Sequence, residues 1–392
     1  MIIGIDASRA FQKQKTGIEE YSYQVIKHLR DILKDEEVIL YCNPKINKIE
    51  YADPVKFRDA GSRQDGTFNG VNFDLPKKWR IKYLRSPIFW TQVRLSLELL
   101  FHPVDVLFVP AHTVPLVHSK NTIVTIHGLE YEYCPKAYSF WQRFYMRRVI
   151  KNSCRWAKRI IAVSDNTRKD LMKLYKVPGE KVKVIYEGIG DNNFQFPISN
   201  FQKISNDKIF KPYFLFIGRL EERKNIAGIV EAFEILKRKY KISQKLILIG
   251  KFGFGGEKIK SKIDSSEYKS DIILTGYVSD EDKFYLMANA DVFLFPTFYE
   301  GFGLPILEAQ SVGAPVVTSN VSSMPEVSGE GAVLVDPKDS SAIAEAVYKL
   351  ISNESYKNDI IEKGYNNIKR FSWDKCAGEI AEAILGAGEI RI

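Results

Sequence analysis

Short apolar segments alternate with longer amphipathic stretches along this chain, and this alternation constrains its fold more than any other feature. In the first half we expect strands at Ile2–Ile5, Val38–Tyr41, Val106–Val109, Thr122–Ile126, Arg159–Val163 and Lys183–Tyr186. Helical patterns lie between them, at Glu19–Leu33, Pro87–Leu100, Phe140–Ala157 and Thr167–Tyr175. Buried strands separated by helices predict a parallel sheet that is covered on both faces.

The alternation starts again after residue 211. We expect the second series of strands at Tyr213–Ile217, Lys245–Ile249, Ile272–Thr275, Val292–Phe295, Pro315–Val317 and Ala332–Val335. A chain of 392 residues is long enough for two such domains. The stretch 191–211 has no clear period and predicts a linker, and the polar stretch 43–75 predicts an irregular insertion. The sequence therefore predicts an α/β fold with two doubly wound, Rossmann-like domains that face each other across a cleft.

The positive charge of the chain is confined to its first half. Lys and Arg exceed Asp and Glu by 11 in residues 1–200, whereas residues 201–392 carry two more acids than bases. Residues 76–94 and 141–159 combine basic side chains with aromatic ones, among them Trp79 and Trp90, and contain no acid. This mixture predicts binding to an anionic membrane surface, and solvated basic helix faces are the alternative. No nucleic-acid-binding motif accompanies it, so we expect no nucleic-acid partner.

The sequence predicts a cytoplasmic protein that is peripheral on the inner face of the membrane. The first residues do not show the basic region followed by an apolar core that is typical of a secretory signal, so we expect no signal peptide there. No apolar run approaches the roughly 18–20 residues that span a bilayer. The four cysteines show no zinc or disulfide spacing and are expected to be reduced.

The segment Glu300–Glu308 predicts an anion-binding loop. It follows an expected strand and contains Gly301 and Gly303, which permit close backbone approach to a ligand. Pro305 suits the first position of a helix, whose free amides would then receive a phosphate. Glu300 and Glu308 place one carboxylate on the loop and one inside the helix. The alternative is a plain glycine turn, with Glu308 favourable in a first helical turn.

The segment Gly218–Asn225 is the second candidate for phosphate binding, because it lies directly after an expected strand. An arginine such as Arg219 can grip a phosphate at two points, and a lysine such as Lys224 supplies a point charge. By contrast, Glu222 and Arg223 are expected to be solvated charges ahead of the next helix.

These motifs resemble the donor domain of the retaining glycosyltransferases of family 4, the large group 1 family with the two-domain B-type fold. The resemblance rests on Phe216–Leu220, Arg223–Asn225, Gly276–Val278 and the E-x7-E motif Glu300–Glu308. It is weaker over the first domain, at Thr16–Ile18, Thr125–His127 and Ala162–Ser164. Here Gly128 follows His127, where the family often has Asp, and Gly17 stands alone where the family often has two glycines.

The resemblance implies a domain division and a set of residue roles. Residues 1–195 would bind the acceptor, residues 208–373 would bind the nucleotide-sugar donor, and residues 374–392 would form a helix that crosses back to the first domain. Arg219 and Lys224 would neutralise the leaving diphosphate, Glu300 would hold a hydroxyl of the transferred sugar, and Glu308 the ribose. The remaining contacts would come from Gly17, His127, Gly218, Tyr277, Val278, Phe302, Gly303 and Leu304.

The resemblance thus implies a retaining, metal-independent hexosyltransferase. It would act on a glycan or lipid-linked saccharide in cell-surface polysaccharide synthesis. Because residues 16–21 and residues 323–327 resemble the mannosyltransferase branch of the family, GDP-mannose is the preferred donor. No cofactor or metal is expected, since two cations and a helix end stabilise the leaving group by themselves. A nucleotide-sugar 2-epimerase and a catalytically inactive glycan-binding subunit are the alternatives.

Overall fold

The computed structural model describes residues 1–12, 15, 17–44, 65–68, 71–86, 89–190 and 212–388. The chain forms two compact units. The first contains Met1–Leu129, Phe144–Gly188 and Ser372–Ile392, and the second contains Glu130–Arg143 and Ile189–Phe371. The predicted linker 191–211 lies outside the described residues, and the predicted domain boundaries stay a prediction.

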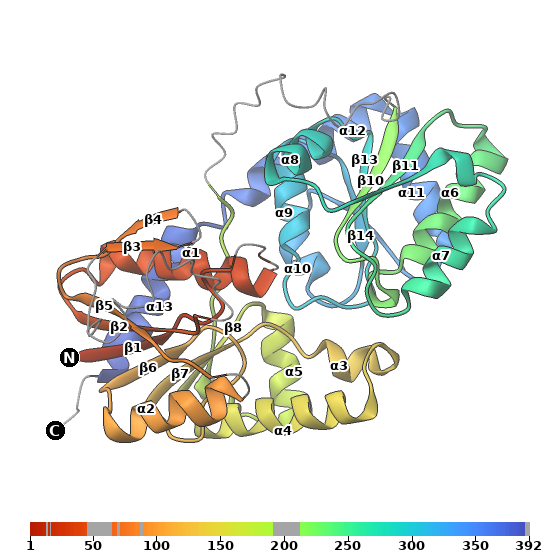
Figure 1. The fold of residues 1–392 in the computed structure, drawn as a ribbon. Helices are drawn as coiled ribbons and strands as arrows, with labels where there is room; N and C mark the ends of the chain where they lie inside the picture. The colour runs from red at the N-terminus through yellow and green to blue at the C-terminus, as the bar shows by residue number, and fades with distance from the viewer. Residues whose placement is uncertain are drawn as a thin grey trace. The chain divides into compact units, whose positions relative to one another are not determined.

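The first unit is built on a seven-stranded parallel sheet with the strand order β5-β2-β1-β6-β7-β8-β9 (Figure 1). Its strands are β1 (Ile2–Asp6), β2 (Glu37–Cys42), β5 (Trp79–Tyr83), β6 (Val106–Val109), β7 (Asn121–Ile126), β8 (Arg159–Ala162) and β9 (Val182–Val184). Within the predicted insertion, β3 (Asp65–Phe68) and β4 (Val71–Asp74) form an antiparallel hairpin.

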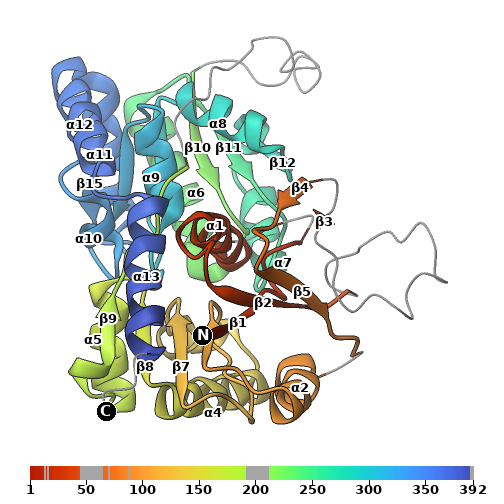
Figure 2. The same ribbon diagram turned by 90° about the vertical axis from the view of Figure 1, so that its left-hand side faces the viewer.

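The helices between residues 17 and 181 mostly follow the amphipathic stretches, and those within residues 130–143 belong to the second unit. They are α1 (Gly17–Ile32), η2 (Trp90–Leu95), α2 (Ser96–Phe101), α3 (Glu130–Tyr133), η3 (Pro135–Ala137), α4 (Phe140–Trp156), α5 (Asp165–Tyr175) and η4 (Gly179–Lys181). The last helix, α13 (Trp373–Gly388), packs against α1, β6 and β7, and Figure 2 shows it beside α1. The apolar side chains of α13 thus complete the core of the first unit.

The second unit has a six-stranded parallel sheet with the order β12-β11-β10-β13-β14-β15. Its strands are β10 (Tyr213–Ile217), β11 (Lys245–Ile249), β12 (Ile272–Gly276), β13 (Val292–Phe295), β14 (Val316–Ser319) and β15 (Val333–Val335). The helical segments are η6 (Glu222–Lys224), α6 (Ile226–Tyr240), α7 (Gly256–Asp264), η7 (Lys269–Asp271), α8 (Asp280–Ala288), α9 (Leu304–Ser311), α10 (Met324–Ser328), α11 (Ser340–Ser352) and α12 (Glu354–Ile368). The prediction of two doubly wound α/β domains is therefore confirmed.

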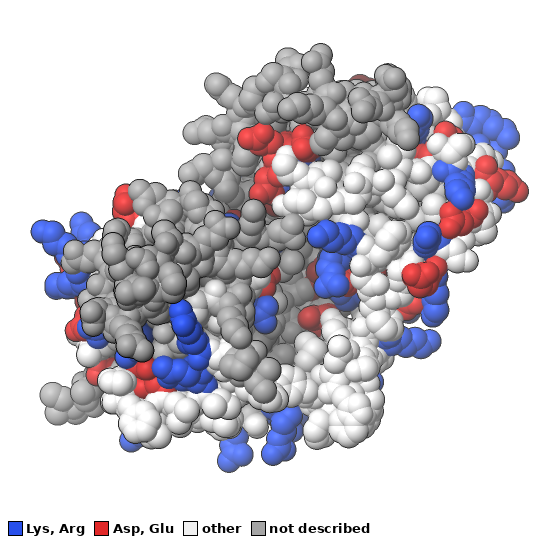
Figure 3. Space-filling model, viewed as in Figure 1, with Lys and Arg blue, Asp and Glu red and all other residues white. Residues whose placement is uncertain are grey.

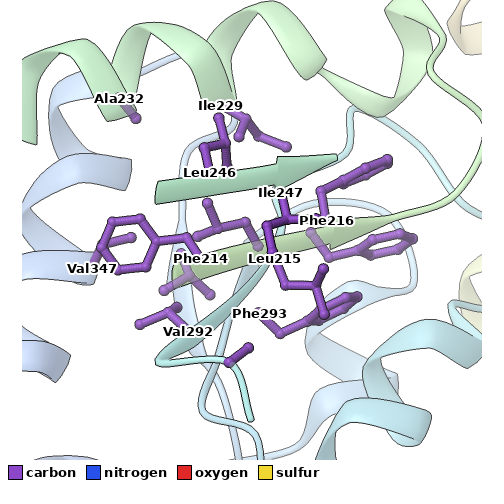
Figure 4. Packing of buried hydrophobic residues seen from close by; sticks show 14 of the residues in the cluster. Phe214, Leu215, Phe216, Ile229, Ala232, Leu246, Ile247, Val292, Phe293 and Val347 are labelled. Carbon is purple, nitrogen blue, oxygen red and sulfur yellow. The ribbon is translucent and has the colours of Figure 1, made fainter. Parts of the chain in front are cut away.

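The core of the second unit surrounds β10. Phe214 and Leu215 pack with side chains of β11, β13 and the covering helices, as Figure 4 shows. Because both faces of β10 are buried, its sequence reads as a continuous apolar run rather than an alternation.

The order of this sheet determines where a ligand can bind. The chain runs from β10 outward to β11 and β12, then returns to place β13 on the other side of β10. Such a reversal leaves a crevice at the carboxyl ends of the two central strands. The loops after β10 and β13 border this crevice, and they carry Lys224 and Glu300.

Two aromatic residues of the predicted membrane surface are core residues instead, which corrects that part of the prediction. Trp79 and Trp90 are buried, and their indole N–H groups donate to the carbonyls of Leu33 (3.0 Å) and Leu84 (2.7 Å). Among the described residues, no helix is both long and apolar enough to cross a membrane.

Candidate functional site

The loops after β10 and β13 are joined by hydrogen bonds across the crevice. Asn225, in left-handed conformation (φ 58°), donates through Nδ2 to the carbonyl of Pro296 (3.0 Å). The amide of Phe298 donates to the carbonyl of Arg223 (3.0 Å). These links hold the side chains of both loops in one place.

Glu300 forms the centre of a charged group within the second unit. Its Oε1 accepts from Nη1 of Arg223 (2.8 Å) and pairs with the ammonium of Lys224. The Lys224 Nζ also lies 4.9 Å from the ring centroid of Phe295. The structure thus brings together Lys224 and Glu300 as residues of one site.

Burial and charge act against each other on these groups. Burial alone would raise the pKa of Glu300, but Arg223 and Lys224 outweigh it and hold the pKa below its ordinary value. Burial lowers the pKa of Lys224, and the neighbouring charge of Arg223 adds to that effect despite Glu300. The carboxylate is therefore held firmly as an anion that contacts two cations.

Arg223 was expected to be a solvated charge, and that prediction is wrong. Its side chain is largely buried, and Nη1 also donates to the carbonyl of Tyr299 (2.8 Å). Glu222, by contrast, pairs at the surface with Lys258 (3.1 Å). Only the tertiary structure could separate these two neighbours, because the partner of Arg223 lies 77 residues further along the chain.

Two serines that the sequence analysis did not assign support the Glu300 loop. Ser322 Oγ donates to the carbonyl of Glu300 (2.6 Å) and accepts from its amide (3.2 Å). Ser323 Oγ lies within hydrogen-bond distance of the carbonyls of Glu300 (2.9 Å) and Phe302 (2.6 Å). Adjacent serines before a helix are a weak signal, since they also occur as ordinary helix caps.

The glycine loop leads directly into α9. Gly303 is the residue before this helix and has φ 121°, a conformation that favours glycine. A Cβ atom there would lie 2.9 Å from Cε of Met324. Pro305 stands in the first turn, where its missing N–H costs no hydrogen bond, and the amide of Ile306 donates to the carbonyl of Gly303 (3.0 Å). The start of a helix is a site that favours an anion. Phe302, whose side chain is buried, and Gly303 hold this turn in place.

Glu308 lies inside α9 and has its own partner. Its Oε1 accepts from Nζ of Lys283 on α8 (2.8 Å), and Lys283 also faces Asp280 (3.4 Å). Burial would lower the pKa of Lys283, but the two carboxylates outweigh it and raise it. Tyr277 and Val278 precede α8; the Tyr277 ring is exposed and Val278 packs on the core.

Gly218 and Arg219 directly follow β10, and the amide of Gly218 donates to the carbonyl of Ile249 (3.0 Å). The Arg219 side chain is 65% exposed, and its Nε pairs with Oε1 of Glu221 (2.8 Å). Gly218 has φ 147°, so its backbone conformation favours glycine. Arg219 is linked to the group around Glu300 indirectly, through Glu221, whose Oε2 lies 3.7 Å from Nη2 of Arg223. A role for Arg219 requires its side chain to reach a bound ligand.

The chain contains an Asp-x-Asp triplet, Asp280-Glu281-Asp282, whose paired carboxylates bear on the expectation of no metal. These residues form the first turn of α8, where Ser279 Oγ lies 2.7 Å from Oδ2 of Asp282 and accepts from its amide (3.1 Å). Carboxylates in a first turn stabilise a helix. Among the residues that the structure describes, no three His, Cys, Asp or Glu side chains form a metal-sized group.

The first unit holds His127 and Gly17. His127 follows β7, and its Nε2 lies 2.8 Å from the carbonyl of Pro110, so this nitrogen carries a proton and donates. Its Nδ1 lies 3.3 Å from Glu187, and the ring packs edge-on against Tyr21. Both ring nitrogens are thus engaged. Gly17 begins α1, and a Cβ atom there would meet no atom within 4 Å.

His112, which the sequence analysis did not single out, lies beside His127. It follows β6 with a left-handed backbone (φ 27°), a strained conformation that is often found at functional sites. Its ring lies 5.3 Å from that of His127, and burial lowers its pKa so that the imidazole is neutral. The sequence does not indicate the positive φ of His112, because only glycine commonly signals such a conformation.

Many ligand-binding enzymes, nucleotide-sugar transferases among them, are parallel α/β chains with charged residues at the switch point of a sheet. Family models support the transferase class over both units. The model described as Glycosyl transferases group 1 matches residues 198–367, and the model described as Glycosyltransferase Family 4 matches residues 15–192.

Similar proteins agree with the family models. O-antigen chain mannosyltransferase B of Escherichia coli is 32% identical over 266 residues, 67% of this chain and 70% of that protein. O-antigen chain mannosyltransferase RfbU of Salmonella typhimurium is 25% identical over 362 residues, 92% of this chain and 94% of that protein. Sucrose-phosphate synthase from Thermosynechococcus elongatus shares the fold, with TM-score 0.73, 17% identity and coverage of 99% and 100%.

The chain belongs to glycosyltransferase family 4, the group 1 glycosyltransferases. It is therefore a glycosyltransferase with the two-domain B-type fold. This result confirms the resemblance and favours a transferase over an epimerase or an inactive subunit.

Proposed function

We propose that this protein transfers mannose from GDP-mannose, with retention and without a metal ion. The acceptor is a glycan or lipid-linked saccharide in cell-surface polysaccharide synthesis. The choice of mannose rests on the two relatives that are named mannosyltransferases. The observation that carries the chemistry is the group of Lys224, Arg223 and Glu300 at the switch point of the second sheet, beside the N-terminus of α9.

The residues of the second unit take separate roles toward the donor. The amides of Phe302, Gly303 and Leu304 face the diphosphate, and Lys224 and Arg219 neutralise it as it leaves. Glu300 holds a hydroxyl of the transferred sugar. Glu308, oriented by Lys283, binds the ribose hydroxyls, and Tyr277 and Val278 line the base.

The transfer step exchanges one bond for another on the same face of the sugar. The bond from the anomeric carbon to the β-phosphate oxygen breaks, and the acceptor oxygen bonds to that carbon. The acceptor proton passes to the departing phosphate, which becomes a better base as its charge grows. Lys224 stabilises that charge in a largely buried site, where a fixed cation acts more strongly than in water. In the first unit, Gly17 lets its loop approach the phosphates, and His127 contacts the sugar.

The first unit binds the acceptor at an anionic membrane surface. Of the basic segments 76–94 and 141–159, the second supplies most of the charge for this association, because Arg80, Lys82 and Arg94 of the first pair with Glu37 and Glu98. The protein is thus peripheral on the cytoplasmic face of the membrane. Nucleic acid is not a partner in this proposal.

A thermal-shift panel of GDP-, UDP- and ADP-sugars tests the donor. A ligand that binds only the native state raises the melting temperature, so GDP-mannose should give the largest shift. Addition of EDTA should leave that shift unchanged. A larger shift with UDP- or ADP-sugars would refute the choice of donor.

Replacement of Lys224 tests the mechanism. Lys224→Ala should lower kcat about 10²- to 10³-fold, because a fixed charge at the leaving group is lost. The matched control is Lys258→Ala, since Lys258 is an exposed lysine of the same unit. Near-normal kcat in Lys224→Ala would remove Lys224 from the mechanism.

A further inference from the structure

The segment η2–α2 of the first unit exposes apolar side chains where a surface helix normally carries polar ones. The five most exposed residues between Phe89 and Phe101 are all apolar, from Leu97 at 45% to Phe101 at 72%. Leu97 and Leu100 are three residues apart in the α-helix α2 and so share a face, while Val93 lies in the π-helix η2 and Phe89 directly precedes it. We call this set the apolar stripe: Phe89, Val93, Leu97, Leu100 and Phe101.

The inner side of the same segment carries its carboxylate. The Glu98 side chain is only 5% exposed and faces Nζ of Lys82 (2.5 Å), Nδ1 of His102 (3.0 Å) and Nη1 of Arg94 (3.7 Å). Burial of a carboxylate is costly even when it is paired, and isolated acids are rarely found inside. A helix that turns its acid inward and leaves Leu97 and Leu100 exposed is suited to an apolar surrounding on its outer side.

A connecting loop joins the apolar stripe to α4. The amide of Val117 donates to Ser96 Oγ of α2 (3.2 Å), and the amide of Val114 donates to Ser153 Oγ of α4 (2.9 Å). Leu116, between these two anchors, is exposed. Figures 1 and 2 both draw α2 and α4 at the same end of this unit.

The exposed side of α4 supplies positive charge next to the apolar stripe. From Phe144 onward this helix exposes four basic residues, namely Arg147, Arg148, Lys151 and Arg155. It also exposes the rings of Phe144 and Tyr145. Figure 3 shows blue side chains projecting from the lower edge, where α4 runs in the view of Figure 1.

We propose that the apolar stripe inserts into the boundary between headgroups and acyl chains of an anionic lipid bilayer, while the basic side chains of α4 bind the headgroups. Apolar side chains beside cations and aromatic rings are the composition of interfacial membrane helices. A second copy of the chain is a poorer partner, because a two-fold interface would oppose the same cations.

This inference rests on the proposed membrane association and adds hydrophobic insertion to it. The two components respond differently to salt. Headgroup attraction is screened, whereas insertion of apolar side chains is not. Neither component requires a nucleotide-sugar.

Vesicle flotation of the full chain tests the proposal, with phosphatidylcholine vesicles that contain or lack phosphatidylglycerol, at low and high salt. The wild type should float with the anionic vesicles and keep part of its binding at high salt. Leu97→Glu with Leu100→Glu should lower the partition coefficient about 100-fold or more at low salt, because the lost burial of each leucine is worth roughly a factor of ten. At high salt this variant should not bind.

The matched control is Met172→Glu with Leu174→Glu, which changes two exposed apolar residues of α5 in the same unit and should float like the wild type. Thermal unfolding and light scattering of each variant report folding and oligomeric state. Loss of all wild-type binding at high salt would leave electrostatic association and overturn insertion. Absence of any lipid binding would overturn both membrane association and insertion. If the wild type is a dimer and the Leu97/Leu100 variant is a monomer, the apolar stripe binds a second copy of the chain instead.

Discussion

At the scale of single residues, the site depends on charges that the fold holds close together. Glu300 contacts two cations whose side chains are largely buried, so removal of this one carboxylate takes the shared counter-charge from both. Ser322 and Ser323 fix the backbone of Glu300 at the same time. The geometry of this group is therefore set before any donor binds, which is the condition for strong electrostatic catalysis.

Glu300→Gln should destabilise the protein by about 3 kcal/mol at neutral pH, because Lys224 and Arg223 lose their common counter-charge. The native pKa of Glu300 lies below its ordinary value of 4.5. Its stabilising effect is therefore complete above that ordinary value and is lost as pH falls through the lower native pKa. The difference in melting temperature between wild type and variant should be constant at neutral pH and shrink below about pH 4.5. A difference that does not change with pH would contradict this account.

Lys283→Met should weaken donor binding about tenfold, because Glu308 loses the charged hydrogen bond that orients it. The turnover number should change little, since Lys283 is assigned to the ribose end of the donor. Steady-state kinetics with varied GDP-mannose separates KM from kcat. Lys258→Met serves as the control, and a fall in kcat at unchanged KM would contradict the assignment.

The sequence predicted Lys224 and Glu300 because both follow buried strands, where ligands of parallel sheets bind. It did not predict Arg223, because a charge ahead of a helix looks solvated until its partner across the crevice is known. His112 was not predicted either, because its positive φ is a property of the backbone that the residue type does not indicate.

At the scale of elements, the β13–α9 connection forms the centre of the proposed donor site. Its glycine is required by conformation, because Gly303 has positive φ and Met324 occupies the space of a Cβ atom. The prediction of this connection from the sequence succeeded because glycine and proline mark turns and helix starts directly. Strand β5 was not predicted, because Arg80 and Lys82 alternate with Trp79 and Ile81, and such a run also fits a basic surface.

Gly303→Ala should lower the free energy of unfolding by about 1–3 kcal/mol, the cost of a strained backbone with a close contact. It should also reduce the thermal shift by GDP-mannose, because the amides of α9 are displaced. Gly386→Ala is the control: it lies in α13, a Cβ atom there meets nothing within 4 Å, and it should stabilise by about 0.5–1 kcal/mol. Equal stability of the two variants would contradict the strain at Gly303.

At the scale of the whole molecule, the chain returns to its first unit at the end. Residues 372–392 follow the second unit in sequence but belong to the first, where α13 packs on α1. The spacing of apolar residues in this segment predicts an amphipathic helix but does not assign it to a unit, because amphipathic helices cover both sheets. The resemblance to the family supplied the expectation of a crossing helix.

A chain that ends at Phe371 should lose stability in the first unit. Hydrogen exchange should become faster in α1, because Trp373, Ile380 and Ile384 no longer cover it. Exchange in α6 of the second unit should be unchanged. A chain that ends at Gly388 keeps α13 and should behave like the full chain; unchanged exchange in α1 of the shorter chain would contradict the described packing.

The most direct test of the proposed function is the first product formed from a donor and a mannose-terminated oligosaccharide, with EDTA present. The account predicts transfer from GDP-mannose, a new α-mannoside in the NMR spectrum of the initial product, and a severe loss of turnover in Lys224→Ala. Transfer only from UDP- or ADP-sugars, or a β-linked initial product, would contradict it.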